Sequence, residues 1–220
     1  MARARRGMLL RMREICESGS GPNRSFELEL FRLHGGPVAG IDEAGRGPWA
    51  GPVVAAAVIL EADQTPSGLN DSKKLKESKR EALYAHLREC AHVGVGIAEV
   101  DRIDRDNILR ATLWAMAQAL AALPIEPACA LVDGNRCPDL PCRAQSLIKG
   151  DALSSCIAAA SIIAKVTRDR IMADLALTHP EYGWERNKGY GTREHAHALT
   201  RHGVTQHHRR SFKPVRAVLA

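Results

Sequence analysis

The sequence has few aromatic residues and no long apolar run. Phe, Trp and Tyr make up 4% of the 220 residues, which argues against an extended base-stacking platform for single-stranded nucleic acid and predicts a core of Ala, Leu, Ile and Val. No apolar run reaches the roughly 20 residues that cross a bilayer. The apolar stretch near the start is interrupted by Arg11 and Arg13, too early for the hydrophobic segment of a signal peptide. We therefore expect a cytoplasmic protein.

The cysteines are scattered along the chain. The six cysteines, at positions 16, 90, 129, 137, 142 and 156, mostly lie within apolar or helical patterns, which is typical of reduced thiols that pack as small hydrophobic side chains. Cys137 and Cys142 have no second pair of Cys or His residues nearby, which argues against a structural zinc site.

Positive charge is concentrated near the C-terminus. The formal net charge is +6, and residues 181–220 hold eight Lys or Arg, three Asp or Glu and five His. A basic region of this kind favours a polyanionic partner, most simply nucleic acid. A solubilising surface is the alternative, and charge alone does not separate the two.

The pattern of apolar residues predicts one α/β domain over residues 37–220, preceded by a basic, partly flexible extension over residues 1–36 with a short helix at 26–33. The domain should contain a mixed sheet with helices on its faces and a C-terminal helical element from about residue 181. We expect strands at 38–41, 53–60, 93–100, 128–132 and 144–148, and helices within 71–91, 106–123, 154–178 and 192–201.

Four acidic residues follow apolar strands although they are far apart in the sequence: Asp42, Glu43, Asp133 and Asp151. Each of them alone is typical of a turn or a helix cap. As a set they indicate one site, because strand ends collect at one edge of an open sheet. Four carboxylates repel one another unless divalent cations neutralise them, and oxygen ligands suit two Mg²⁺ or Mn²⁺ ions in phosphodiester hydrolysis. We expect Asp42 to bridge both ions, with Glu43 and Asp133 at one and Asp151 at the other.

Residues near these carboxylates suit a nucleic-acid substrate. Gly45, Arg46 and Gly47 form a turn with little side-chain bulk, where backbone groups could reach a ribose 2′-OH; the alternative is an ordinary tight turn. Tyr190 lies between two glycines and could stack on a sugar or a base; the alternative is a partly buried loop residue. Six cations are candidates for phosphate contacts, although each alone could be a solvated surface charge: Lys73, Lys74, Lys149, Lys165, Arg168 and Lys188.

Several segments are more specific than this chemistry requires. Residues 40–48 (GIDEAGRGP) and 50–54 (AGPVV) resemble the opening signature of bacterial type 2 ribonuclease H, ribonuclease HII. Further segments resemble that family in the same order: 69–75 (LNDSKKL), 132–135 (VDGN), 149–151 (KGD), 158–169 (AAASIIAKVTRD), 188–190 (KGY) and 208–212 (HRRSF). The resemblance extends over nearly the whole predicted domain.

The resemblance implies a ribonuclease H-like fold with a five-stranded mixed sheet, flanking helices and a small C-terminal helical element. It implies a Mg²⁺- or Mn²⁺-dependent endoribonuclease that leaves 5′-phosphate ends, cleaves RNA in RNA–DNA hybrids and nicks duplex DNA 5′ of a single ribonucleotide. In this sequence the family's catalytic acids correspond to Asp42, Glu43, Asp133 and Asp151. Its ribose-reading loop corresponds to residues 45–47, and its sugar-packing tyrosine to Tyr190. We expect a monomer.

Two other hypotheses remain open. A nucleic-acid-binding protein with a degenerate site is disfavoured because all four carboxylates are present. A junction nuclease or transposase-like enzyme on the same fold is disfavoured because the 45–47 loop and Tyr190 suit ribose recognition.

Overall fold

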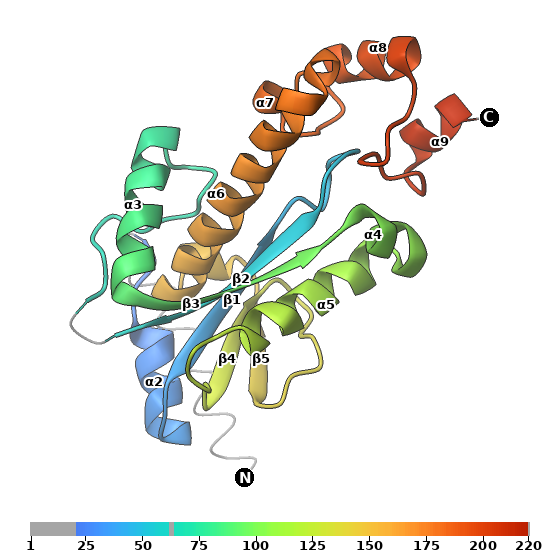
Figure 1. The fold of residues 1–220 in the computed structure, drawn as a ribbon. Coiled ribbons are helices and arrows are strands. Elements are labelled where there is room, and N and C mark those ends of the chain that lie inside the picture. Colours follow the sequence, from blue (N-terminus) through green and yellow to red (C-terminus); the bar gives the residue numbers. More distant parts are fainter. Residues whose placement is uncertain (1–20, 62–63, 220) are drawn as a thin grey trace.

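A five-stranded mixed sheet forms the centre of the protein. The computed structural model describes residues 21–61 and 64–219 (Figure 1). The strands run in the order β3-β2-β1-β4-β5, with the first three antiparallel and β4 and β5 parallel to β1. The predicted mixed sheet is confirmed. Its strands are β1 (Val38–Ala44), β2 (Val53–Leu60), β3 (Ala91–Ala98), β4 (Cys129–Asp133) and β5 (Arg143–Leu147).

Two strands, β1 and β3, differ from the prediction by more than one residue at a boundary. β1 continues past residue 41, so Asp42 and Glu43 pair with Ala56 and Ala55 of β2 instead of following the strand. β3 begins at Ala91, two residues earlier than predicted, because α3 (Glu77–Cys90) passes into it without a loop. Neither difference changes which strands are neighbours.

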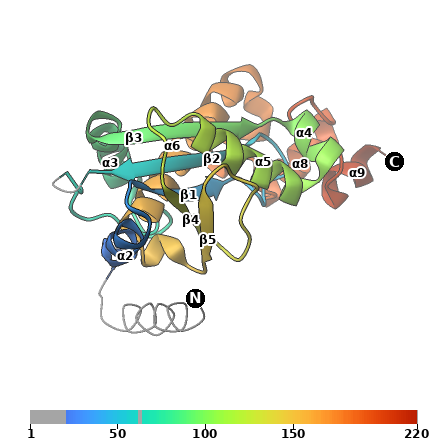
Figure 2. The ribbon, with the colours of Figure 1, turned by 90° about the horizontal axis from the view of Figure 1, so that it is seen from below.

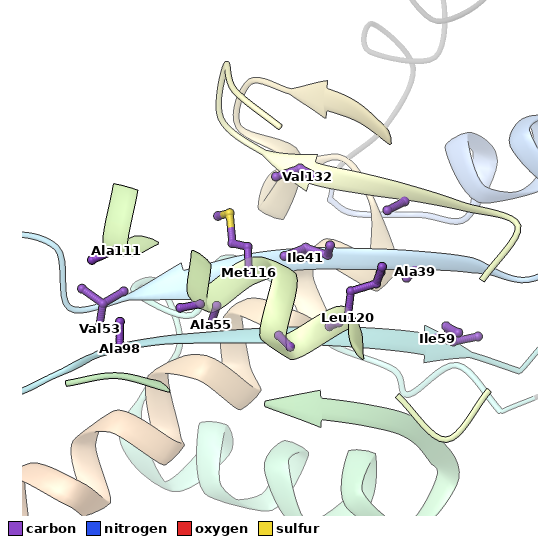
Figure 3. Packing of buried hydrophobic residues seen from close by; sticks show 14 of the residues in the cluster. Ala39, Ile41, Val53, Ala55, Ile59, Ala98, Ala111, Met116, Leu120 and Val132 are labelled. Carbon is purple, nitrogen blue, oxygen red and sulfur yellow. The ribbon is translucent and has the colours of Figure 1, made fainter. Parts of the chain in front are cut away.

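Helices cover both faces of the sheet, because alternate residues of each strand point to opposite faces. On one face, Ile41 and Ala55 lie in the cluster that α5 (Ile108–Ala121) completes with Met116 and Leu120 (Figure 3). On the other face, the neighbouring residues of β2 pack against α3 and α6 (Ser155–Thr178). Both clusters consist mainly of Ala, Val, Leu and Ile, as the scarcity of aromatic residues predicts.

The long helix α6 approaches β1 closely at Gly40. A Cβ atom at this position would lie 2.2 Å from the carbonyl carbon of Cys156 and 2.3 Å from the backbone nitrogen of Ile157. Real side chains do not tolerate such distances, and a helix backbone cannot move aside as a flexible side chain can. The absence of a side chain at residue 40 therefore allows α6 to lie directly on the central strand.

We expect Gly40→Ala to lower the free energy of unfolding by about 3 kcal/mol, since overpacking a rigid core displaces backbone. Gly134→Ala is the control. Gly134 has φ +97° and nothing within 4 Å of its would-be Cβ, so that variant reports only the backbone cost of about 1–2 kcal/mol. Urea unfolding of both variants measures the difference. Equal stability of the two would contradict the close-packing argument.

Helix α2 (Ser25–His34) belongs to the packed domain, which corrects the predicted boundary at residue 37 for the described residues. Phe26 is fully buried beside β1 and β4. Glu27 is also buried, and its Oε1 accepts hydrogen bonds from Ser154 Oγ (2.7 Å) and the Cys156 N–H (2.8 Å) at the start of α6. This carboxylate satisfies backbone donors at a helix N-terminus. Residues 1–20 of the predicted extension lie outside the described residues.

The C-terminal region forms a small helical element at the end of the molecule opposite α2 (Figure 1, Figure 2). Tyr182 and Trp184 are buried there against Met172 of α6, in a cluster that also includes Ala50. Of the described helices, none is long and apolar enough to cross a membrane. The remaining elements are α4 (Val100–Asp106), η1 (Gly150–Ala152), η2 (Pro180–Tyr182), α7 (Trp184–Asn187), α8 (Arg193–His202) and α9 (Lys213–Leu219).

Candidate active site

Strand register places two of the predicted carboxylates at one edge of the sheet. β1 and β4 are parallel, with Ile41 opposite Val132, so Asp42 and Asp133 follow at the same level. Asp42 is only 7% exposed, and its Oδ1 accepts a hydrogen bond of 2.7 Å from the N–H of Glu43. The antiparallel pairing of β1 with β2 continues through Asp42 and Glu43 and holds the backbone of these two residues in place.

Asp151 comes from the short helix η1, which a hydrogen bond ties to β4. The N–H of Gly150 donates to Asp133 Oδ1 at 2.7 Å. Lys149 has the left-handed backbone conformation, with φ +58°, and this turns the chain from β5 into η1. A Cβ on Gly150 would meet Asp133 Oδ1 at 3.3 Å and Ile157 Cδ1 at 2.5 Å, so a side chain there would crowd this hydrogen bond.

The pKa values show that the four carboxylates share one electrostatic environment. Burial raises the pKa of Asp42 well above its ordinary value, and the negative charges of Glu43, Asp133 and Asp151 raise it further. Burial also raises the pKa of Asp151, with Asp133 adding to the rise. Carboxylates that repel one another in this way are typical of a site that binds cations.

The donor set of the site fits a hard divalent cation, since it consists of carboxylate oxygens with no competing thiol or imidazole among them. In residues 21–61 and 64–219, however, no three His, Cys, Asp or Glu side chains are grouped closely enough to hold a metal ion together. Mg²⁺ commonly keeps several waters and uses one or two carboxylates together with substrate phosphate. The assignment of all four residues as metal ligands therefore stays a prediction.

A cleft of about 640 Å³ opens beside Asp42 and Glu43. The 45–47 loop lines it, and Tyr190 faces the loop, with Cε1 3.4 Å from a would-be Cβ on Gly47. Arg46 is half exposed and bonds Glu43 at 3.2 Å. Asp133 and Asp151 do not line this cleft. Ser72 and Ile108 do, and the sequence prediction did not include them.

The predicted cations fall into two groups. Lys73 and Lys165 line the cleft. Lys165 Nζ lies 2.6 Å from Asp169 Oδ1, and burial lowers its pKa. Lys74, Lys149 and Lys188 are not part of the lining, and Lys188 Nζ donates to the carbonyl of Glu185 at 2.7 Å. Among the lysines, Lys73 and Lys165 are thus the ones placed to meet a phosphate group in the cleft.

Residues 39–215 match the family model described as Ribonuclease HII. The chain belongs to the ribonuclease HII family. It is 57% identical to the ribonuclease HII of Parvibaculum lavamentivorans over 203 residues, which cover 90% of this chain and 74% of that protein. It is 58% identical to the ribonuclease HII of Rhizorhabdus wittichii over 196 residues, covering 89% and 95%.

Solved structures agree with this assignment. The ribonuclease H2 of Pyrococcus horikoshii superposes with a TM-score of 0.70 at 29% identity, covering 83% of this chain and 96% of that one. The fold is therefore that of ribonuclease H, and the protein is an endoribonuclease. Family membership supports the predicted action on RNA–DNA hybrids.

Arg168 has a different place in this ribonuclease HII from the one predicted. It borders the cleft but is only 1% exposed. Its Nε, Nη1 and Nη2 donate to the carbonyls of Pro52, Lys188 and Ala50 at 3.0–3.1 Å. With these bonds made, the guanidinium has almost no surface left for a phosphate group. We correct the predicted phosphate contact: Arg168 joins the segment at 50–52 to the loop that carries Tyr190.

A second buried arginine, Arg209, fixes the 45–47 loop by hydrogen bonds to its backbone. Its guanidinium donates to the carbonyls of Gly45, Arg46, Gly51 and Pro52 at 2.5–3.2 Å. Burial lowers the pKa of Arg209 to about 9 and that of Arg168 to about 10, so both stay protonated at neutral pH. The sequence prediction missed Arg209 as a site-shaping residue, because in a basic C-terminal region it resembles its solvated neighbours.

Proposed function

We propose that the protein cleaves the RNA strand of RNA–DNA hybrids and nicks duplex DNA on the 5′ side of a single embedded ribonucleotide. One observation carries the proposal: the glycine-flanked loop at 45–47 lines the same cleft as Asp42 and Glu43, with Tyr190 facing it. Hydrolysis of a phosphodiester bond needs only the carboxylates and the divalent ions that they would hold. A sugar-reading loop beside them is needed only by an enzyme that distinguishes ribose from deoxyribose.

Each side chain has a role in this proposal. Asp42, Glu43, Asp133 and Asp151 would hold two divalent cations, Mg²⁺ or Mn²⁺. Such ions, when bound, supply charge stabilisation for an in-line displacement at phosphorus. The hydrogen bonds at Asp42 Oδ1 and Asp133 Oδ1 orient these two carboxylates before any ion binds, which lowers the cost of assembling the site.

Recognition of the ribonucleotide falls to the loop and the tyrosine. Gly45 is buried, has φ +95°, and a Cβ there would lie 2.0 Å from Arg168 Nε, so the glycine lets the loop lie directly against Arg168. Gly47 is exposed and presents backbone without a side chain to the cleft. Backbone groups of residues 45–47 would contact the 2′-OH, which is both a donor and an acceptor. Tyr190 is 47% exposed, and its ring would pack on the sugar of the following nucleotide.

Binding of the duplex would rest on phosphate contacts. Lys73 and Lys165 lie in the cleft, and the basic C-terminal region supplies further positive charge. Affinity should fall as salt rises, because neutralised phosphates release counterions. A monomeric state and a cytoplasmic location stay predictions from the sequence.

The proposal predicts where and when a labelled duplex is cut. A DNA duplex with one ribonucleotide should be nicked only when Mg²⁺ or Mn²⁺ is present, and only at the phosphodiester bond 5′ of the ribonucleotide. Sequencing gels with 5′- and 3′-labelled strands map that bond, and chelator removes the metal in a parallel reaction. Cleavage on the 3′ side, or undiminished cleavage in chelator, would rule out the proposed mechanism.

A further inference from the structure

The backbone carbonyl of Tyr190 is held by a buried histidine. His195 lies in α8, is fully buried, and places Nδ1 3.0 Å from the Tyr190 oxygen. The same oxygen accepts the N–H of Thr192 at 2.8 Å. A carbonyl can only accept, so His195 Nδ1 must carry a hydrogen. The orientation of residue 190 is thus fixed by a side chain of α8 as well as by its own loop.

The other ring nitrogen of His195 must be without a hydrogen. The indole Nε1 of Trp184 lies 3.2 Å from His195 Nε2. An indole nitrogen can only donate a hydrogen bond, so His195 Nε2 is the acceptor. It also lies 3.1 Å from Nε2 of His208. Since His195 Nε2 accepts, His208 Nε2 is the donor in this contact. His195 is therefore neutral and in a single tautomer.

His208 is determined in the same way. Its Nδ1 accepts the backbone N–H of Thr205 at 3.1 Å and lies 2.9 Å from the hydroxyl Oγ1 of the same residue. With Nδ1 accepting and Nε2 donating, His208 is neutral as well. One directed chain of hydrogen bonds runs from Thr205 through His208 and His195 to the carbonyl of Tyr190.

The surroundings of the pair favour this neutral state. Both rings are fully buried, and burial lowers the pKa of His195 and lowers that of His208 to about 3. The neighbouring imidazoles of His195, His179 and His207 oppose charge on His208. At His195, backbone hydrogen bonds to Tyr190 and Gly189 and the charge of Glu194 oppose the lowering of the pKa without reversing it. A proton on either accepting nitrogen would face existing donors and break the chain.

We propose that His195 and His208 are positioning residues that orient Tyr190 for contact with the sugar of the substrate. This inference rests on the proposed function, which gives Tyr190 its role. The hydrogen-bond chain ends on Tyr190, whose ring faces the 45–47 loop at 3.4 Å from the Cβ position of Gly47. Trp49 packs over the same segment, with its ring centroid 5.6 Å from that of His195. Without the hydrogen bond from His195, the backbone at residue 190 could rotate and the Tyr190 ring could leave the cleft.

Two substitutions of His195 separate its two nitrogens. In His195→Asn the amide nitrogen takes nearly the place of Nδ1 and can still donate to the Tyr190 carbonyl. In His195→Gln the amide reaches the place of Nε2, and the bond to residue 190 is lost. We expect His195→Gln to raise the KM for a singly ribo-substituted duplex about tenfold, as the loss of one buried hydrogen bond implies, with little change in kcat. His195→Asn should stay within about threefold of the wild type.

Two comparisons distinguish positioning from general stabilisation. His197→Gln, at an exposed site on the same helix, is the matched control and should leave KM unchanged. In a Tyr190→Ala background, His195→Gln should have no further effect on KM, because coupled residues are not additive. An equal tenfold effect in both backgrounds, or a lowered melting temperature with unchanged KM, would overturn the inference while leaving the proposed function intact. If Tyr190→Ala itself leaves KM unchanged, the role of Tyr190 in the proposed function fails and the inference fails with it.

A measurement on the unaltered protein covers the case in which the variants do not fold. Nitrogen-15 NMR of the histidine rings at neutral pH should show His195 with hydrogen on Nδ1 and His208 with hydrogen on Nε2. A charged ring, or the opposite tautomer in either residue, would overturn the inference.

Discussion

Replacing Asp42 with asparagine should reduce cleavage at least about 10³-fold and yet stabilise the metal-free protein at neutral pH. The buried carboxylate of Asp42 is repelled by Glu43, Asp133 and Asp151, and this repulsion disappears when the charge is removed. Asparagine can still accept the N–H of Glu43, so the local hydrogen bond is kept. A substitution that abolishes activity and raises stability indicates a site in which stability is reduced for the sake of catalysis.

The pH dependence of this effect has a definite sign. The pKa of Asp42 is raised in the folded state, whereas in the unfolded chain it is about 4. The wild type therefore suffers no penalty below about pH 4 and loses stability as pH rises through the folded-state pKa. The advantage of Asp42→Asn should be present at pH 7 and shrink as pH falls toward 4.

Thermal unfolding in chelator measures the effect, since about 1 kcal/mol shifts the melting temperature of a domain of this size by roughly 2–4 °C. Asp139→Asn, at an exposed position, is the control and should change neither activity nor stability. Added Mg²⁺ should stabilise the wild type more than the variant. A variant that is both inactive and less stable at neutral pH would contradict the electrostatic description of the site.

Replacing Arg209 with methionine should lower the free energy of unfolding strongly. The side chain volume is roughly kept, but the carbonyls of Gly45, Arg46, Gly51 and Pro52 lose their donors. An unsatisfied buried polar group costs about 1–3 kcal/mol. Release of the desolvation cost of a buried guanidinium offsets part of this, and we expect a net loss of about 3 kcal/mol.

The same variant should lose its preference for ribose, because the loop that reads the 2′-OH is no longer held. Its neighbour supplies the control: Arg210 is exposed, so Arg210→Met removes the same charge without touching the loop. Urea unfolding and the cleavage rate on a singly ribo-substituted duplex measure both effects. Equal behaviour of the two variants would mean that the basic charge of residue 209, and not its hydrogen bonds, is what matters.

That Asp42 and Asp133 lie at the same level of the sheet could be predicted from the sequence, because the signal is local. Asp42 and Asp133 each come at the end of an apolar strand, and parallel pairing of those strands brings such residues to one edge. The sheet and the covering helices follow from apolar periodicity in the same way. The sequence shows that residue 40 is a glycine, but it does not show that the backbone of Cys156 would lie 2.2 Å from a Cβ atom there.

The features that could not be predicted from the sequence depend on contacts between residues that are far apart in the chain. Arg168 was predicted to meet phosphate, yet its acceptors lie 20 to 118 residues away in the chain. Glu27 binds the start of α6 across more than 120 residues, so the domain begins earlier than composition indicates. His195 and His208 stand in a basic region, and their neutral state depends on burial and on fixed donors that only the fold supplies.

The central claim is that one cleft combines phosphodiester hydrolysis with recognition of a single 2′-OH. Initial cleavage rates on two duplexes that differ only in that hydroxyl, measured with the same divalent metal, test this claim most directly. The duplex with one ribonucleotide should be cut at least about 10³-fold faster than the all-DNA duplex, because a site built to bond a hydroxyl rejects the analogue that lacks it. Equal rates on the two duplexes would contradict it.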